Sequence, residues 1–456
     1  MMMLSEIANV LNTQVIGKDV RVNSVGTDSR NIVDGQLFVA IKGDRFDGNQ
    51  YAEDAITQGA AAALISDGEV KASPAVMVDD TRGALGELAH YWREKLNKPV
   101  VAITGSNGKT TVKEMITAIL NVAKGSVLAT KGNLNNDIGM PLTLLGMRES
   151  HTCAVVEMGM NHLGEIRYLT KIAQPQIAVV NNAGTAHIGE LGSRDAIAEA
   201  KGEIFEGLAD DGLAVINADD DYCEYWQSLN TNRQVMTFGL EAEADVTAQY
   251  AVKENKTNIR LKTPNGEASM TLNLLGKHNV MNVLAASAVA VGLNVSNDEI
   301  VKGLSVFAGV KGRLDLVEGL NQSTVIDDTY NANPDSMKVA IDVLAEQKKS
   351  AGHQLIFVMG DMAELGEKAE EMHADIGQYA KEKELTALFS FGEMSALASQ
   401  AFGKAGQHFD KLEQLIDAVV AQQHANTCVL VKGSRMMQME RVVNAVIKDQ
   451  KTGSVH

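Results

Sequence analysis

Short apolar runs alternate with amphipathic stretches along the chain from Pro99 onward. Each run has four to six apolar residues and ends in Gly, Asn or Asp, and the segments between them have the spacing of surface helices. This alternation predicts βαβ units around a parallel sheet, in which ligands bind at the carboxyl ends of the strands. The first set of runs is PVVAITG (99–105), CAVVEMG (153–159), IAVVNNAG (177–184) and LAVINAD (213–219).

A second and smaller set of the same kind lies in the last third of the chain. It consists of STVIDDTY (323–330), QLIFVMGD (354–361), ALFSFG (387–392) and TCVLVKGS (427–434). The first 80 or so residues differ again, with short strand-like pieces around one helix-like stretch. We therefore predict an α/β chain of three domains, at residues 1–82, 83–312 and 313–456, with a hinge around residues 305–315.

Composition and charge narrow the class of protein. The net charge is −17, which argues against a general nucleic-acid binder, because neutralising phosphates needs clustered Lys and Arg. The three cysteines are far apart in sequence, which excludes a disulfide framework and suits a reducing compartment. No apolar run approaches the roughly 18 residues of a membrane helix, and the N-terminus has no basic region typical of a signal peptide. We expect a cytoplasmic enzyme that does not insert into a membrane.

The segment AITGSNGKTT (102–111) is the strongest single signal for chemistry. An apolar strand runs into a glycine-rich turn and then into a helix, an arrangement whose backbone N–H groups attract a phosphate. A common phosphate loop has glycine where this chain has Ile103, so the motif departs from the usual pattern. The predicted nucleotide-binding residues of this loop are Gly105, Asn107, Gly108, Lys109, Thr110 and Thr111.

The form TGSNGKTT resembles the loop of the Mur ligases and their folylpolyglutamate synthase relatives. Further stretches that resemble this family lie in all three predicted domains. They are TDSR (27–30), KGDRFDG (42–48), GNLNNDIGMPLTLL (132–145), EMGMNHLGEI (157–166), NNAGTAHIGELGS (181–193), AKGEIFEGL (200–208), GKHNVMNVLAA (276–286), KGRLD (311–315), DDTYNANPDSM (327–337), VMGDMAELG (358–366) and KGSRMMQME (432–440).

The resemblance implies a fold and a reaction. The fold is an N-terminal α/β domain for a UDP-sugar, a central parallel-sheet domain for ATP, and a Rossmann-like C-terminal domain. Within the family, the residues at 132–145 and 327–337 resemble one type of ligase. This resemblance implies ATP-dependent addition of D-alanyl-D-alanine to UDP-N-acetylmuramoyl-tripeptide in peptidoglycan precursor synthesis. The route passes through an acyl phosphate and a tetrahedral intermediate and releases ADP and phosphate.

The reaction needs positive charge around several anions, and the resemblance assigns residues to that task. It implies that Lys109 contacts the transferring phosphoryl group and that Thr110 and Glu157 bind Mg²⁺, which prefers oxygen ligands. It places His187 on a second Mg²⁺. Because imidazole is an unusual ligand for this ion, a role in orienting substrate stays open. It also implies a carbamylated Lys201, in a helix-like stretch that we expect to begin near this residue.

Residues from two further segments are implied to bind the nucleotide. Asn282, which we expect to begin an alanine-rich helix over 283–291, is placed near the base. Arg313 and Asp328 lie beyond the predicted hinge and are placed on the phosphates and the ribose, so both reach ATP only when the domains close. Their implied neighbours are Tyr330, Asn331 and Asn333.

The substrates are harder to place. Cations suited to the UDP diphosphate occur in the first domain, and the implied substrate-binding residues there are Ser29, Arg30, Lys42, Asp47 and Gly48. Those implied to line the path to the γ-phosphate are Asn135, Asn136 and Thr185. The dipeptide is expected at the strand ends near 360–366 and 433–437, with no single residue favoured.

Three alternatives stay open at the level of sequence. The first is a sibling ligase, which would add glutamate or a diamino acid. The second is a P-loop kinase or NTPase, which would have the usual loop glycine and an Asp at the strand end. The third is a UDP-sugar binding protein, which would need no catalytic residues. The expected partners are ATP and the two small-molecule substrates, and the resemblance favours a monomer. The sequence does not specify whether the third residue of the tripeptide is lysine or diaminopimelate.

Overall fold

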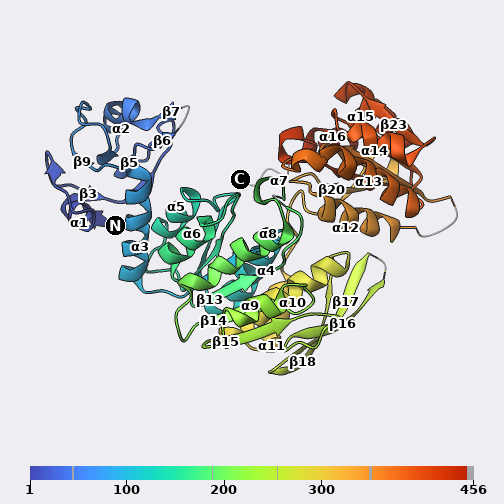
Figure 1. The fold of residues 1–456 in the computed structure, drawn as a ribbon, viewed down its shortest axis with the longest axis horizontal. Helices are drawn as coiled ribbons and strands as arrows, with labels where there is room; N and C mark the ends of the chain where they lie inside the picture. Colours follow the sequence, from blue (N-terminus) through green and yellow to red (C-terminus); the bar gives the residue numbers. More distant parts are fainter. Residues whose placement is uncertain (44–45, 187, 254, 349–351, 449–456) are drawn as a thin grey trace.

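The computed structural model describes residues 1–43, 46–186, 188–253, 255–348 and 352–448. The chain forms three α/β domains, with the N-terminal and C-terminal domains standing on either side of a central one (Figure 1). The α/β class and the three-domain arrangement expected from the apolar runs are confirmed. None of the helices in the described ranges has the length and apolar character needed to cross a membrane.

The N-terminal domain is built on a five-stranded sheet in the order β2-β9-β8-β5-β4. Its strands run parallel except for β2, which is antiparallel to β9. The strands are β2 (Val15–Ile16), β4 (Ser24–Gly26), β5 (Gln36–Val39), β8 (Ala62–Ile65) and β9 (Ala75–Met77). The other elements are β1 (Met2–Met3), α1 (Leu4–Val10), β3 (Arg21–Val22), β6 (Lys42–Gly43), β7 (Phe46–Asp47), η1 (Gly48–Tyr51) and α2 (Ala52–Thr57).

Helix α3 (Thr81–Leu96) joins this domain to the next one. Its N-cap is Asp80, whose carboxylate accepts a hydrogen bond from the backbone N–H of Arg82 at 2.9 Å. Its apolar face, with Leu85, Leu88 and Trp92, is buried in a core shared by both domains. The helix contacts α1 on one side and α5 (Gly139–Leu145) and α6 (Glu165–Ala173) on the other. The boundary expected after residue 82 falls in its first turn.

The central domain contains a six-stranded, fully parallel sheet in the order β11-β12-β10-β13-β14-β15. The four predicted runs form β10 (Val100–Thr104), β12 (Cys153–Glu157), β13 (Ile177–Val180) and β14 (Leu213–Asn217), each buried along its whole length. Helices cover both faces, which is why these strands read as continuous apolar runs. The remaining elements are α4 (Lys109–Lys124), β11 (Val127–Ala129), α7 (Ile188–Leu191), α8 (Arg194–Gly202), η2 (Glu203–Gly207), α9 (Cys223–Ser228) and β15 (Gln234–Phe238).

The sequence reading missed an antiparallel sheet in the same domain. It consists of β16 (Thr247–Lys253), β17 (Lys256–Thr263) and β18 (Gly266–Leu272), and it shares a core with α10 (Lys277–Gly292) and α11 (Asn297–Ser305). The residues of β17 alternate strictly between exposed and buried, which is a half-buried strand pattern visible in the sequence. Helix α10 begins at Lys277, so the expectation that Asn282 begins a helix was wrong. The early start reflects Gly276, whose positive φ of 84° ends the preceding extended chain.

The C-terminal domain has a second six-stranded sheet, in the order β19-β20-β24-β21-β22-β23, with only β19 antiparallel. The predicted second set of runs forms β20 (Thr324–Asp328), β21 (Gln354–Gly360), β22 (Ala387–Phe391) and β24 (Thr427–Lys432). The other elements are β19 (Asp315–Glu318), η3 (Leu320–Gln322), α12 (Pro334–Ala345), η4 (Gly366–Lys368), α13 (Ala369–Glu382), α14 (Ser395–Phe402), β23 (Gly406–Phe409), α15 (Leu412–Gln422), η5 (Arg435–Met437) and α16 (Glu440–Val446).

Candidate active site

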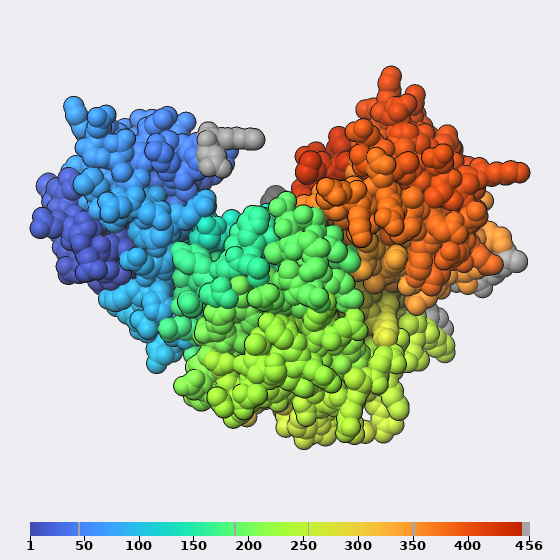
Figure 2. All heavy atoms as spheres, viewed as in Figure 1, coloured from blue at the N-terminus to red at the C-terminus, as the bar shows by residue number. Residues whose placement is uncertain are grey.

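A cavity of about 1250 Å³ lies where the three domains meet, and Figure 2 shows the molecule hollowed between its outer domains. It opens at the carboxyl ends of β10 and β12, the position predicted for a ligand of a parallel sheet. Most of the predicted site residues line it: Asn107, Gly108, Lys109, Thr110, Thr111, Asn135, Asn136, Glu157, Asn282, Arg313, Asp328, Tyr330, Asn331 and Asn333.

The phosphate loop connects β10 directly to α4. Gly108 is the N-cap of α4 with φ of 81°, and a Cβ there would stand 2.5 Å from both the Nδ2 of Asn181 and the Oδ1 of Asn282. The backbone N–H groups of Ser106 and Asn107 are held by Asn182, the latter at 2.9 Å from its Oδ1. Two asparagines at the end of β13 therefore fix the loop, and sequence analysis had quoted them without assigning this role.

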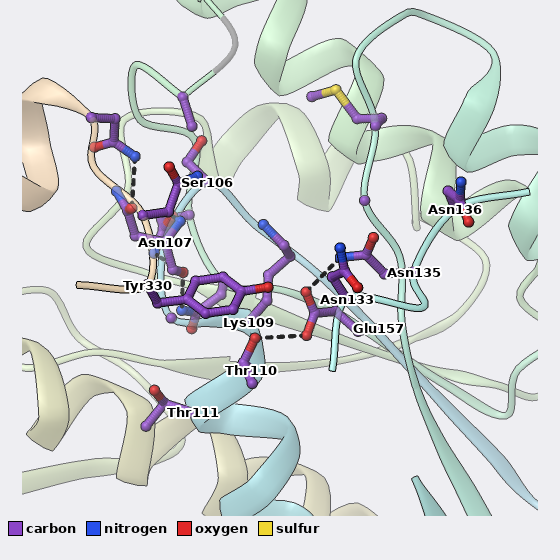
Figure 3. Close-up of a pocket in the computed structure, with 18 of the residues that line it drawn as sticks. Ser106, Asn107, Lys109, Thr110, Thr111, Asn133, Asn135, Asn136, Glu157 and Tyr330 are labelled. Carbon is purple, nitrogen blue, oxygen red and sulfur yellow. Dashed lines mark hydrogen bonds between the residues drawn. The ribbon is translucent and has the colours of Figure 1, made fainter. Parts of the chain in front are cut away.

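Lys109 is the first residue of α4, and its side chain lies in the cavity near Thr110 and Glu157 (Figure 3). Its Nζ donates to the carbonyl oxygen of Gly105 at 2.7 Å, so Gly105 lies behind the loop and does not line the cavity. Burial lowers the pKa of Lys109, the charge of Arg313 adds to this effect, and Glu157 opposes it. An anion bound in the loop would restore the balance of charge around this ammonium group.

Glu157 ends β12 and is only 3% exposed. Its Oε2 accepts a hydrogen bond from the hydroxyl of Thr110 at 2.9 Å, and its Oε1 accepts one from the Nδ2 of Asn135 at 2.8 Å (Figure 3). The Nη2 of Arg313 donates to the same Thr110 hydroxyl at 2.9 Å. A buried carboxylate beside a hydroxyl offers the hard oxygen ligands that suit Mg²⁺.

The described residues hold no group of three or more His, Cys, Asp or Glu side chains arranged around a metal ion. Mg²⁺ usually takes one or two carboxylates, a phosphate and several waters. The predicted second ligand, His187, lies outside the described residues.

Lys201 is placed differently from the expectation. It lies in the last turn of α8 and not near a helix start, because Ser193 caps the helix eight residues earlier by accepting from the N–H of Ala196. The side chain is 2% exposed. Burial lowers its pKa well below the usual value, the charge of Lys109 adds to this, and Asp220 opposes it. Lys201 therefore lies behind the cavity wall within electrostatic reach of Lys109.

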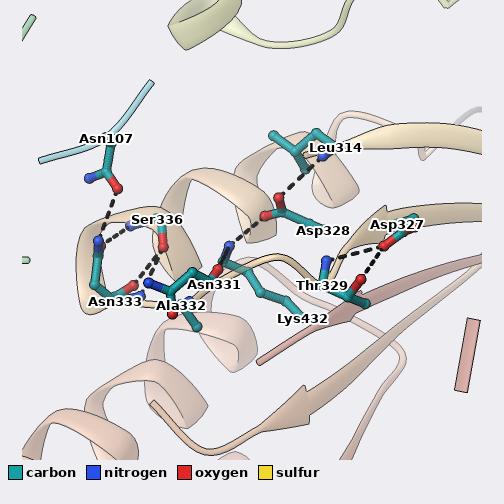
Figure 4. A network of polar contacts seen from close by, with 10 residues as sticks. All are labelled: Asn107, Leu314, Asp327, Asp328, Thr329, Asn331, Ala332, Asn333, Ser336 and Lys432. Atoms are coloured by element: carbon teal, nitrogen blue, oxygen red, sulfur yellow. Dashed lines mark hydrogen bonds and ion pairs between the residues drawn. The ribbon is translucent and has the colours of Figure 1, made fainter. Parts of the chain in front are cut away.

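The C-terminal domain contributes a compact polar network to the cavity (Figure 4). The carboxylate of Asp328 pairs with the Nζ of Lys432 at 2.6 Å, and Lys432 also donates to the carbonyl oxygen of Asn331 at 2.8 Å. The Nδ2 of Asn333 donates to the Oδ1 of Asn107 at 2.9 Å, which ties this domain to the phosphate loop. Sequence analysis did not single out Lys432. Its pairing depends on β20 lying beside β24, where Asp328 and Lys432 are direct partners.

Two more contacts complete the nucleotide side of the cavity. The guanidinium of Arg313 lies 4.1 Å from the ring centre of Tyr330, a cation–π arrangement that fixes both side chains. Asn282 is buried inside α10, where its Nδ2 donates to the Oδ1 of Asn279 at 3.2 Å. Burial lowers the pKa of His278 on the same helix to about 4, so this lining residue is neutral near pH 7.

The remaining predicted residues lie away from the cavity lining. The backbone N–H and hydroxyl of Thr185 both donate to the Oδ2 of Asp335, at 2.6 and 2.8 Å, so this residue joins two domains. In the N-terminal domain the guanidinium of Arg30 pairs with Asp28 at 2.8 Å, and Lys42 lies 3.9 Å from Asp47. Ser29 and Gly48 lie beside these pairs, and none of the N-terminal candidates Ser29, Arg30, Lys42, Asp47 and Gly48 lines the cavity.

Comparisons with known families cover all three domains. The Mur ligase family, catalytic domain, matches residues 21–93. The Mur ligase middle domain matches residues 103–290, and the Mur ligase, glutamate ligase domain matches residues 312–435. The matches leave only short segments between them, so the family similarity extends over most of the chain.

Individual relatives are similar over nearly the full length. The chain is 42% identical to the UDP-N-acetylmuramoyl-tripeptide–D-alanyl-D-alanine ligase of Escherichia coli, covering 97% of this chain and 98% of that one. A structure of the UDP-N-acetylmuramoylalanyl-D-glutamyl-2,6-diaminopimelate–D-alanyl-D-alanyl ligase from Acinetobacter baumannii has a TM-score of 0.84 at 36% identity, covering 96% of each chain. The MurF ligase of Thermotoga maritima in complex with ADP has a TM-score of 0.83 at 28% identity, covering 93% of this chain and 97% of that chain.

Proposed function

The chain belongs to the Mur ligase family, and we propose that it joins UDP-N-acetylmuramoyl-tripeptide to D-alanyl-D-alanine at the expense of ATP. The reaction forms an amide bond, releases ADP and phosphate, and supplies a precursor of peptidoglycan. The observation that supports it most directly is the cluster of Lys109, Thr110, Glu157 and Arg313 at the end of the parallel sheet. A cavity that this cluster shares with all three domains suits a reaction of three substrates.

The chemistry explains why such a cluster is needed. A carboxylate oxygen of the tripeptide attacks the γ-phosphorus of ATP, the bond to the β-phosphate oxygen breaks, and ADP leaves. The amine of the dipeptide then attacks the carbonyl carbon of the acyl phosphate, and the tetrahedral intermediate expels phosphate. Lys109 and Arg313 would stabilise the negative charge on the transferring group, since preorganised cations act most strongly in a site shielded from water.

The oxygens of Thr110 and Glu157 would hold a Mg²⁺ ion on the nucleotide. When bound, the ion neutralises charge on the phosphates and fixes their orientation. Asn135 keeps the carboxylate of Glu157 turned toward Thr110, as its hydrogen bond at 2.8 Å indicates. His187 is proposed as a ligand of a second ion.

Lys201 is proposed to carry a carbamate. The lone pair of a neutral Nζ attacks the carbon of CO₂, a N–C bond forms, and the nitrogen loses a proton to solvent, which turns a basic side chain into an anion. Burial of Lys201 favours the neutral amine that this step requires. The anion would interact favourably with the neighbouring charge of Lys109.

The remaining site residues are proposed to act in three groups. Asn282, Arg313 and Asp328, with Tyr330, Asn331 and Asn333, would bind the nucleotide, while Asn136 and Thr185 would border the path of the tripeptide. The first-domain residues Ser29, Arg30, Lys42, Asp47 and Gly48 would bind the UDP group. We also propose the domain bounds 1–82, 83–312 and 313–456, a monomeric state, and action in the cytoplasm.

The test is ADP release by the purified protein with ATP and Mg²⁺. We expect release only when UDP-N-acetylmuramoyl-tripeptide and D-alanyl-D-alanine are both present. Matched reactions replace the dipeptide with single amino acids, or the tripeptide precursor with a shorter one. Release with lysine, glutamate or diaminopimelate on a shorter precursor would identify a sibling ligase and contradict the proposal.

A further inference from the structure

The cavity continues past the phosphate loop to the N-terminus of α3. This arm of the cavity is lined by Asp80, Arg82, Asp137 and Tyr168, none of which has a role in the proposal above. The Nη1 of Arg82 lies 3.3 Å from the Oδ2 of Asp137, and the side chains are 48% and 35% exposed. A half-exposed ion pair contributes little to stability, so its groups are available to a ligand.

The arm begins close to the reacting groups. Asn135 donates to Glu157, and Asp137 follows two residues later, a stretch of chain that spans at most about 7 Å. Asn136 lies between them and accepts from the backbone N–H of Gly139, which holds this turn at the start of α5. Figure 3 shows Asn135 turned toward Glu157, with Asn136 further away along the same segment. A substrate whose carboxylate sits near Glu157 can therefore extend a side chain toward the Arg82–Asp137 pair.

The charges in this arm are mixed. Burial raises the pKa of the Tyr168 hydroxyl, the carboxylates of Asp137 and Asp80 add to this, and Arg82 opposes it. The other arginines and lysines of the described cavity lining come from the phosphate loop and the C-terminal side: Lys109, Arg313 and Lys432 contact Gly105, Thr110 and Asp328, and Arg435 pairs with Glu440. Arg82 is thus the guanidinium available at the far end.

We propose that Arg82 and Asp137 bind the distal amino-acid group of the third residue of the tripeptide, and so select diaminopimelate over lysine. This inference rests on the proposed function. Diaminopimelate ends a three-methylene arm with both a carboxylate and an ammonium group, which match the guanidinium of Arg82 and the carboxylate of Asp137. Lysine brings only the ammonium group, leaving Arg82 without an anionic ligand and close to a second positive charge.

A diphosphate also pairs with a guanidinium, as the distal carboxylate of diaminopimelate does. The UDP group of the substrate is therefore a second anion that Arg82 could bind. The two sources predict different results, because every substrate carries the UDP group and only one carries the distal carboxylate. Loss of a contact to the UDP group lowers activity with all tripeptides by the same factor. Loss of a contact to the distal carboxylate lowers activity with the diaminopimelate tripeptide alone.

The experiment measures kcat and KM for dipeptide-dependent ADP release with two UDP-tripeptides, ending in meso-diaminopimelate or in lysine. We expect the unmodified protein to favour diaminopimelate in kcat/KM by about tenfold or more, as a site built to pair a charged group rejects a substrate lacking it. Arg82→Gln should remove this preference by raising KM for the diaminopimelate substrate, while activity with lysine changes by less than about twofold. Arg82→Lys keeps the charge and should retain part of the preference.

The matched control is Arg260→Gln, which breaks an Arg260–Glu267 pair of 2.7 Å on the β17–β18 hairpin outside the cavity lining. This variant should have unchanged kcat and KM with both tripeptides. Equal losses with both tripeptides in Arg82→Gln, or a preference of the unmodified protein for lysine, would overturn the inference. Dipeptide-dependent release with neither tripeptide would refute the proposed function itself, and the inference with it.

Discussion

The Nη2 of Arg313 donates a hydrogen bond to the Oγ1 of Thr110 at 2.9 Å, across 203 residues of sequence. Arg313 lies two residues before β19, which begins the C-terminal sheet, and Thr110 is the second residue of the helix that follows the phosphate loop. The same guanidinium lies 4.1 Å from the ring centre of Tyr330. The contact brings a cation from the start of the C-terminal domain to the place where the γ-phosphate is expected, where it would complete the positive charge around the reacting group.

Replacing Arg313 should therefore lower turnover more than ATP binding. Arg313→Ala removes one preorganised donor to the transferring phosphoryl group, and we expect kcat to fall by about 10²-fold. Arg313→Lys keeps the charge but loses the planar fork and the stacking on Tyr330, so it should recover only part of that loss. Steady-state kinetics of ADP release measures both variants. A change confined to KM for ATP, with kcat intact, would contradict this role.

Glu157→Gln should raise the Mg²⁺ concentration required for activity. The amide has a single oxygen, which can accept from Thr110 while its NH2 group faces Asn135, and it has no charge for the ion. We expect half-maximal activity at roughly 10- to 100-fold higher Mg²⁺, a loss typical of weakened metal sites. The control is Glu267→Gln, which removes a surface carboxylate paired with Arg260. An unchanged Mg²⁺ titration for Glu157→Gln would exclude this carboxylate as a ligand.

Lys201→Ala should abolish most turnover, since neither the carbamate nor a substitute for its charge can form. With the unmodified protein, incubation with ¹³C-bicarbonate should give a carbamate carbon signal in the NMR spectrum that Lys201→Ala lacks. Lys113→Met serves as a control, because Lys113 is also buried but donates at 2.6 Å to the carbonyl oxygen of Thr130. Full turnover by Lys201→Ala at ordinary Mg²⁺ would exclude the carbamate.

The strand ends of the site could be predicted from the sequence because a strand buried on both faces is a continuous apolar run. The runs ending at Thr104 and Glu157 gave the phosphate loop and the carboxylate beside it, and both lie where the pattern placed them. The position of Lys201 was wrong because helix ends depend on caps, and Ser193 was not recognised as the cap of α8.

Other parts of the site depend on strand order, which apolar runs do not specify. Asp328 meets Lys432 because β24, about 100 residues later in the chain, lies between β20 and β21. Arg82 reaches the cavity because α3 packs across two domains. The antiparallel sheet differs again: Ile259 and Leu261 alternate with exposed polar neighbours, so β17 has the pattern of a half-buried strand and not the continuous apolar run of the parallel sheets.

A buried histidine of the C-terminal domain should make the protein sensitive to mild acid. His373 is fully buried, its Nε2 accepts from the backbone N–H of Met362 at 2.9 Å, and its Nδ1 lies 2.6 Å from the carbonyl oxygen of Ala369. The imidazole is therefore neutral, with the proton on Nδ1. Burial lowers its pKa, against the opposing effects of the hydrogen bond to Ala369 and the charge of Asp361.

The sign of the effect follows from linkage. A histidine whose pKa is lowered by folding binds more protons when unfolded, so the free energy of unfolding falls as pH drops below about 6.5, the usual value. Protonation of Nε2 also removes the acceptor for Met362, at the start of a segment whose Glu364 carbonyl accepts from Gly189 of the central domain at 3.1 Å. Loss of stability should thus be accompanied by weaker contact between these domains.

His373→Gln tests this directly, because glutamine cannot titrate in this range. The variant should be less stable than the unmodified protein at pH 7.5, having lost the imidazole hydrogen bonds, and the difference in Tm should shrink as pH is lowered to 5. The protection factor of the Met362 amide, which corrects for the slower intrinsic exchange at low pH, should fall on acidification in the unmodified protein only. His424→Gln, at an exposed site of the same domain, is the matched control. If the difference in Tm between His373→Gln and the unmodified protein stays constant or widens toward pH 5, His373 does not titrate as proposed.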